Sequence, residues 1–342
     1  MQSLTGEGHA HVPLFFGWKE YCMANNPGKS EAAYPNVREL SLQRDFAGFN
    51  LQRLRERTIE FFLFLAALSS VAITLGIVGV LVYESEQFFT HVSVFEFLTD
   101  TEWTVLFANP RYGILPLVTG TLVTSITALV VALPLGTIVA IYLSEYANNQ
   151  VREILKPIIE LLSAVPTVVF GYFALLFVTP LLQRFLPGLP GFNMLSAGIV
   201  IGIMIIPYIS SLSEDAIKAV PTTIREGSYA MGATRLQTAM RVLVPSAFSG
   251  IASAYVLGFS RAVGETMIVA IAAGQQPNLT LNPMEGAATI TAYIVQVSLG
   301  DLPHGSIAYQ SIFAAGMMLM LMTLAFNIGG YFLRKKFREI YE

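Results

Sequence analysis

The chain has 342 residues, of which 54% are hydrophobic and only 13% are charged. A typical soluble domain carries roughly 25% charged residues, so this chain has too few charges to cover a water-exposed surface of its size. The net charge of −3, without a basic stripe, gives no support to nucleic-acid binding, and the single cysteine, Cys22, excludes an internal disulfide and any Cys-x-x-Cys metal site.

Residues 1–50 are polar, and glycine and proline interrupt every periodic pattern in them. We expect a mobile cytoplasmic extension here, followed by a permease domain over residues 51–342. The arginines of residues 51–58 predict the start of a helix on the membrane surface, where they would meet anionic headgroups.

Six apolar segments follow, and they predict an all-α polytopic membrane protein with six transmembrane helices. A helix needs about 20 apolar residues to cross ~30 Å of hydrocarbon, and most of the segments reach that length. The segments cover approximately residues 59–83, 113–143, 154–182, 195–213, 245–273 and 310–333.

The positive charges predict the orientation of these spans. With six spans, one side of the membrane holds residues 1–58, 144–156, 214–244 and 334–342. All Lys and Arg residues lie in these segments except Arg111 and Arg184, on the other side, and Arg261, within the fifth span. Because cationic loops stay in the cytoplasm, we expect both termini to be cytoplasmic.

The loop 84–112, on the expected outer side, is acidic and rich in aromatic residues, among them Phe88, Phe97 and Trp103. Aromatic side chains close to a membrane face are usually interfacial anchors, and we expect that role here. Contact with an external partner is the alternative.

The loop 214–244, between the fourth and fifth spans, predicts two short helices that are interrupted at Gly232. Pro245 then opens the next span. Ala230 and Met231, beside that glycine, form a small apolar projection that suits a groove on another protein. An ordinary amphipathic connector at the membrane surface is the alternative reading.

The spacing of this loop resembles the EAA loop of ABC importer permeases, with a glutamate, a glycine, two aliphatic residues and a proline at fixed intervals. These positions are filled by Glu226, Gly232, Val242, Val244 and Pro245. The two positions after the glutamate depart from the pattern, because they are small but are not alanines. In that family the loop forms a coupling helix in a cleft of the ATPase subunit. The resemblance therefore implies docking by Glu226, Gly227, Ser228, Ala230, Met231 and Gly232.

Residues 259–267, Phe-Ser-Arg-Ala-Val-Gly-Glu-Thr-Met, are similar to the R-A-x-G-E-T stretch of phosphate-specific permeases, and in particular to PstC-type subunits. The resemblance covers roughly residues 51–342 and implies a type I ABC importer permease of the bacterial inner (plasma) membrane. It implies a non-catalytic subunit that binds no cofactor, with ATP and Mg held by the partner ATPase. The implied partners are a second, PstA-like permease, two PstB-like ATPase subunits, an external PstS-like phosphate-binding protein, inorganic phosphate and membrane lipid.

Arg261 and Glu265 are expected to pair on one helix face, because they stand at positions i and i+4 of the fifth span. An ion inside the bilayer costs roughly 2.5–3.5 kcal/mol on insertion scales, so both groups should face protein or water. One reading is a neutralised structural pair. The other is a substrate path in which Arg261 meets a passing oxyanion, Glu265 holds that arginine when the path is empty, and Ser260 and Thr266 add hydroxyl donors.

Three alternatives stay open at this point. An ABC importer permease for molybdate, sulfate or phosphonate would use similar chemistry. An ion-coupled secondary transporter would show inverted repeats and more intramembrane carboxylates, and no convincing repeat is present. An intramembrane protease needs paired aspartates or a Ser–His arrangement, and neither His nor Asp lies inside the six predicted spans.

Overall fold

The structure is a computed structural model that describes residues 37–105, 107, 109–300, 303 and 305–336, with side chains described from Arg55 onward apart from Leu333 and Lys336. The chain divides into two compact units, Met1–Ile73 and Thr74–Glu342, and each is described by itself. Residues 1–36 of the expected N-terminal extension lie outside the described part of the chain.

Helix α1 (Val37–Phe89) begins in the first unit and ends in the second. It starts well before residue 51, where the sequence predicts its beginning. The residues that lead into the apolar segment are good helix formers, and they contain no proline and only one glycine, Gly48. The stretch Arg55–Phe89 is long and apolar enough to cross a membrane.

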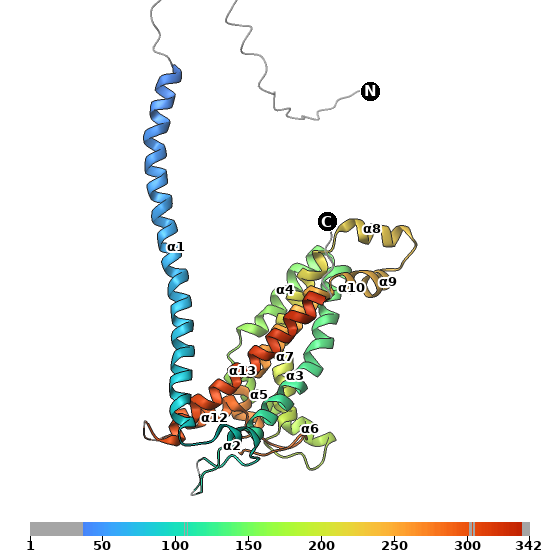
Figure 1. Ribbon diagram of the computed structural model, residues 1–342. Coiled ribbons are helices and arrows are strands. Elements are labelled where there is room, and N and C mark those ends of the chain that lie inside the picture. The colour runs from blue at the N-terminus through green and yellow to red at the C-terminus, as the bar shows by residue number, and fades with distance from the viewer. Residues whose placement is uncertain (1–36, 106, 108, 301–302, 304, 337–342) are drawn as a thin grey trace, which may run out of the picture. The chain divides into compact units, whose positions relative to one another are not determined.

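The remaining helices all belong to the second unit (Figure 1). In chain order they are α2 (Val94–Thr99), α3 (Leu115–Ile141), α4 (Asn149–Ala164), α5 (Thr167–Phe173), α6 (Thr179–Phe185), α7 (Met194–Lys218), α8 (Thr222–Ala230), α9 (Arg235–Thr238), α10 (Val244–Ser246), α11 (Phe248–Val263), α12 (Ile290–Ser298) and α13 (Ile307–Lys336). Four π-helical turns lie between or after them: η1 (Tyr142–Tyr146), η2 (Ala174–Val178), η3 (Ala239–Leu243) and η4 (Val269–Ala273).

Five of the described helical segments are long and apolar enough to span a membrane: Arg55–Phe89, Leu115–Tyr146, Thr167–Phe185, Met194–Lys218 and Ile307–Phe332. A sixth candidate consists of Arg235–Ser246 and Phe248–Val263, which meet the same requirement together but are bent by 74°. No strand occurs in the described ranges, apart from an isolated bridge between Trp103 and Tyr112. The all-α class is confirmed, and the expected six spans are reached when the bent pair counts as one.

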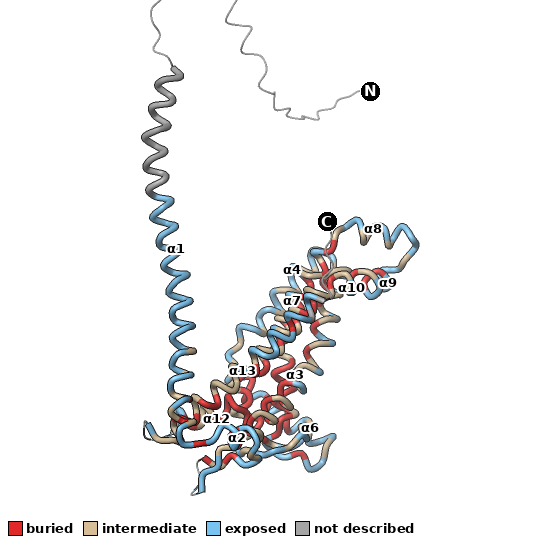
Figure 2. Tube along the Cα trace, in the orientation of Figure 1, coloured by how far each residue is buried: buried red, intermediate tan, exposed pale blue. Residues whose placement is uncertain are grey.

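Helices α3 and α7 form the centre of the second unit, where buried residues are most frequent (Figure 2). Glycines allow the close approach: a Cβ on Gly202 would lie 2.7 Å from the carbonyl oxygen of Ala128, and one on Gly136 would lie 2.7 Å from Cγ2 of Ile209. The two helices are therefore closely packed along these glycines.

The expected third span, residues 154–182, is wrong in its first half. Helix α4 ends at Ala164, and the span proper starts at Thr167. The residue before a proline avoids helical backbone angles, and Val165 and Pro166 are both extended. The charged residues Arg152, Lys156 and Glu160 follow one face of α4, none of its side chains is buried, and Asn148 caps its first turn.

The expected fifth span, residues 245–273, is not one helix either. The chain bends at Ala247, continues as α11, and loses helical structure again at residues 264–266 before the short helical stretch that contains η4. The chain then returns, so that α12 lies in the protein core, with its first backbone N–H, that of Ile290, donating to the Thr121 hydroxyl of α3 at 3.0 Å.

The aromatic residues of the loop 84–112 divide into two groups. Phe88, Phe97 and Trp103 are buried, and Trp103 packs edge-to-face on Tyr293 of α12 with ring centroids 5.0 Å apart. Phe95 is exposed. The expectation that these residues are interfacial anchors is therefore wrong for the buried ones, which form a core between α2 and α12.

Candidate functional site

The loop after α7 folds into the two expected helices, α8 and α9, at one end of α3 and α7 (Figure 1). Gly232 separates them with a φ of +82°, a left-handed angle that glycine adopts without strain. Thr234 then starts α9 with a capping box: its hydroxyl accepts the N–H of Gln237 at 3.3 Å, and the Gln237 side chain accepts the N–H of Thr234 at 2.9 Å. The predicted interruption at Gly232 is confirmed.

The turn between α8 and α9 presents apolar side chains to the surroundings of this chain. Met231 is 89% exposed, and the neighbouring apolar residues Tyr229, Leu236 and Met240 are exposed too. Of the residues expected to dock on the ATPase, the structure leaves exposed Glu226, Gly227, Ala230, Met231 and Gly232. Ser228 differs from these, because its hydroxyl bonds to that of Thr238 at 2.9 Å and ties α8 to α9.

Arg261 and Glu265 do not form the expected ion pair. The helix that would place them on one face ends at Val263, before Glu265, so their spacing no longer brings the side chains together. The Glu265 carboxylate instead accepts the backbone N–H groups of Met267 and Ile268, at 3.1 and 3.4 Å. It therefore caps the helical stretch that follows the break.

Arg261 turns toward α7. Its guanidinium carbon lies 4.4 Å from the centroid of the Tyr208 ring, a cation–π contact. Its Nε is buried and has no hydrogen-bond partner among the described residues. The ring thus covers one face of the guanidinium, and the buried Nε keeps an unused donor.

The hydroxyls of the other two residues expected along the substrate path bond within the protein. The Ser260 hydroxyl donates to the Val256 carbonyl and to Asn327 of α13, at 3.0 and 3.2 Å. The Thr266 hydroxyl donates to the carbonyl of Gly264 at 3.2 Å, within the break. Both hydroxyls thus have protein partners, and a shared substrate path for the four residues stays a prediction.

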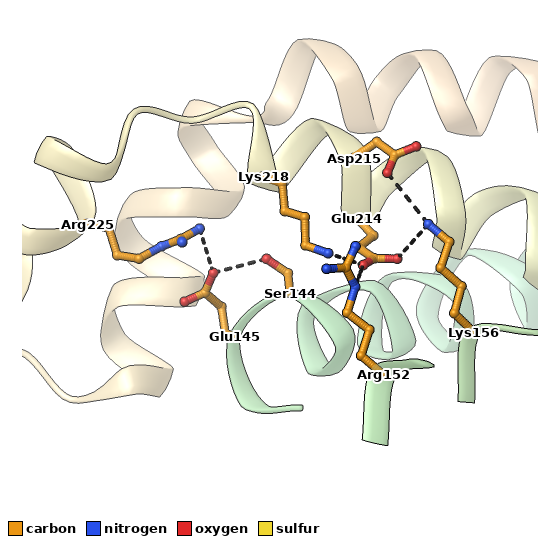
Figure 3. Close-up of polar contacts among 8 residues, drawn as sticks. All are labelled: Ser144, Glu145, Arg152, Lys156, Glu214, Asp215, Lys218 and Arg225. Atoms are coloured by element: carbon orange, nitrogen blue, oxygen red, sulfur yellow. Dashed lines mark hydrogen bonds and ion pairs between the residues drawn. The ribbon is translucent and has the colours of Figure 1, made fainter. Parts of the chain in front are cut away.

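A group of charged side chains that the sequence reasoning missed lies at the end of α7 nearest α8 (Figure 3). The Glu214 side chain is fully buried and is surrounded by three cations, which we call the Glu214 cluster: Arg152 at 2.8 Å, Lys156 at 3.4 Å and Lys218. Arg152 and Lys156 belong to α4, so the cluster fixes α4 to α7. The i, i+4 spacing of Glu214 and Lys218 was the one signal of it in the sequence.

A second ion pair connects α8 to the end of α3. Nη2 of Arg225 lies 2.9 Å from Oε1 of Glu145, in the π-helical turn η1 (Figure 3). The Ser144 hydroxyl donates to the same oxygen at 3.0 Å. The Glu145 side chain is only 3% exposed, so this is a largely buried pair between residues far apart in the sequence.

The opposite end of the second unit contains a cavity of about 690 Å³ between the loop 274–289 and its neighbours. Three side-chain amides face this region or the smaller cavity beside it: Gln275, Gln276 and Gln296. Hydrogen bonds from Thr280 and Asn282 lower the pKa of the Glu285 carboxyl in the same loop below its ordinary value. The cavity lining itself carries no charge.

Residues 132–339 match the family model of the binding-protein-dependent transport system inner membrane component. The probable ABC transporter permease protein YqgH of Bacillus subtilis is 37% identical over 263 residues, which cover 77% of this chain and 83% of the relative. The phosphate transport system permease protein PstC of Mesorhizobium japonicum is 30% identical over 293 residues, which cover 79% of this chain and 88% of the relative.

Among solved structures, a bacterial ABC transporter involved in the import of the acidic polysaccharide alginate aligns over 89% of this chain and 100% of its own, with a TM-score of 0.55 and 17% identity. At that identity the likeness shows the fold alone. With the family model covering more than half of the chain, this protein belongs to the family of binding-protein-dependent transport system inner membrane components.

Proposed function

We propose that this chain is the permease subunit of an ATP-driven importer of inorganic phosphate. The observation that carries the proposal is Arg261, a guanidinium inside the bundle with a buried, unused Nε, at a break in the chain between α11 and η4. A permanent cation with a planar fork of donors suits phosphate oxygens. Relatives named PstC, from Mesorhizobium japonicum and Methanocaldococcus jannaschii, support phosphate as the cargo.

The proposed assembly contains a second, PstA-like permease, two PstB-like ATPase subunits and a PstS-like phosphate-binding protein. A periplasmic-protein complex of the alginate transporter supports a partner of this last type. ATP and Mg bind to the ATPase subunits, and this chain carries no catalytic residue in the proposal. The charge distribution supports a cytoplasmic position for α8 and both termini, and an outer-side position for the 690 Å³ cavity.

In this assembly the exposed turn between α8 and α9 seats in the ATPase, with Met231 at its tip. An apolar helix end in a groove is a recurrent mode of protein recognition. Closure of the ATPase dimer on ATP moves α8, and this movement opens the path past Arg261 to the outside. Hydrolysis then resets it.

Uptake of labelled phosphate into proteoliposomes that contain the whole complex tests the proposal. We expect uptake that requires internal ATP and the phosphate-binding protein. Excess sulfate, molybdate or phosphonate should inhibit this uptake only weakly. Uptake that persists without the ATPase subunits would indicate an ion-coupled carrier. Stronger competition by sulfate or molybdate than by phosphate itself would make the cargo assignment wrong while leaving the importer assignment intact.

A further inference from the structure

Helix α8 is attached to the end of α3 by two neighbouring contacts of different kinds. Ile224 packs into the apolar cluster that Ala140 and Ile217 form at the ends of α3 and α7. Arg225, the next residue, pairs with Glu145 at 2.9 Å (Figure 3). The apolar contact tolerates small shifts, whereas an ion pair with a buried carboxylate resists separation.

Because Glu145 lies in a turn that continues α3, a movement of Glu145 is passed on to that helix. Glu145 lies in η1, a single π-helical turn that continues α3, and such turns are frequent at functional sites because their extra residue permits a local change of register. Helix α3 in turn packs closely against α7 through the glycine contacts, so a displacement of η1 acts on both helices. The neighbouring Glu214 cluster fixes α4 to the same pair.

Arg225 has few other attachments. Its Nε and Nη2 are buried without a hydrogen-bond partner in the described residues, and Nη2 faces the Glu145 carboxylate as an ion pair at 2.9 Å. Glu145 is thus the charged partner of this guanidinium, beside the apolar contact of Ile224.

We infer that the Glu145–Arg225 pair is the contact through which α8 moves α3, so that both are positioning residues that couple ATP hydrolysis to opening of the path. The inference rests on the proposed function, since it needs an ATPase that acts on α8. It assigns to this pair a role in coupling rather than in docking, because the exposed turn around Met231 is on the other end of α8.

The test compares ATP hydrolysis with phosphate uptake in proteoliposomes of the whole complex that carry Glu145→Gln, Arg225→Gln, or the exchange of the two charges, E145R with R225E. Each single change should lower uptake by about tenfold, the scale of a typical coupling energy, while hydrolysis stimulated by the binding protein persists. The exchange should restore much of the uptake. Arg111→Gln is the matched control, because Arg111 pairs with Asp100 and Glu102 at the opposite end of the unit and is 59% exposed.

Uptake per ATP that is unchanged in both single variants would overturn the inference. A parallel loss of uptake, hydrolysis and complex assembly would show that the pair is merely structural, and would overturn the inference too. Size-exclusion chromatography and thermal melting measure the assembly. Failure of the charge exchange to restore coupling in an assembled complex would also overturn the inference. If the unaltered complex takes up no phosphate, the proposed cargo fails instead; the coupling test then uses the anion that is transported.

Discussion

Arg261 of α11 lies against Tyr208 of α7, with 4.4 Å between the guanidinium carbon and the ring centroid. The sequence spacing predicted Glu265 as its partner, but that carboxylate caps the next helical stretch. The arginine is thus held by an aromatic face that competes for none of its hydrogen-bond donors.

Replacement of Arg261 by alanine should abolish phosphate uptake and leave the complex assembled. The side chain has no carboxylate partner among the described residues, so its removal leaves no opposite charge unpaired in the bundle. Labelled uptake and size-exclusion chromatography of the complex measure the two effects. Loss of assembly would show instead that Arg261 has a structural role.

Two substitutions of Tyr208 separate the ring from its hydroxyl. Tyr208→Phe keeps the aromatic face and should leave uptake close to normal. Tyr208→Leu removes a cation–π contact worth about 0.5–2 kcal/mol, and should lower uptake because the guanidinium is no longer held in place. Concentration dependence of uptake checks both variants. Equal behaviour of the Phe and Leu variants would contradict a role for the ring face.

Glu265→Gln and Glu265→Ala distinguish a capping role from a charge role. Gln keeps an oxygen that accepts the N–H groups of Met267 and Ile268, so uptake should stay within about twofold of normal. Ala leaves those groups without the cap and should cost about 0.5–2 kcal/mol in the thermal stability of the complex. A folded Gln variant that transports nothing would show that the negative charge itself is required.

Gly232→Trp should uncouple the ATPase, whereas Gly232→Asn should be tolerated. A Cβ at this position meets no atom of this chain within 4 Å, but the φ of +82° is strained for most residues, at about 1–2 kcal/mol. Asn adopts such angles more readily and is small enough for a groove on the ATPase. Co-purification of the ATPase and phosphate uptake measure the outcome. Normal transport by the Trp variant would contradict docking at this turn.

Glu214→Ala should destabilise the protein far more than Asp215→Ala. The Glu214 carboxylate is fully buried among three cations, and removal of one partner of a buried ion pair costs about 3–5 kcal/mol. Asp215 is 63% exposed and lies 3.8 Å from Lys156, so its loss should cost less than about 1 kcal/mol. Thermal melting of the purified complex compares them. A similar melting temperature for both variants would contradict the importance of the cluster.

The sequence predicted the features that depend on neighbouring residues. Apolar length identified the spans, although Pro166 divided one of them at a point that the apolar run concealed. The interruption at Gly232 also followed from local patterns, because the backbone angles of a glycine involve only a few adjacent residues.

The tertiary structure decided the partners of the charged residues, since these come from distant parts of the chain. The Thr291 hydroxyl of α12 donates to the Glu265 carbonyl at 2.6 Å, so a returning segment lies against the break in the fifth span. Arg261 makes its contact with Tyr208 instead of Glu265. The Glu145–Arg225 pair likewise joins two helices that are separated by four others in the sequence. Helical spacing gives the neighbours of a charge along one helix, but in a bundle the packing of other helices determines which group it meets.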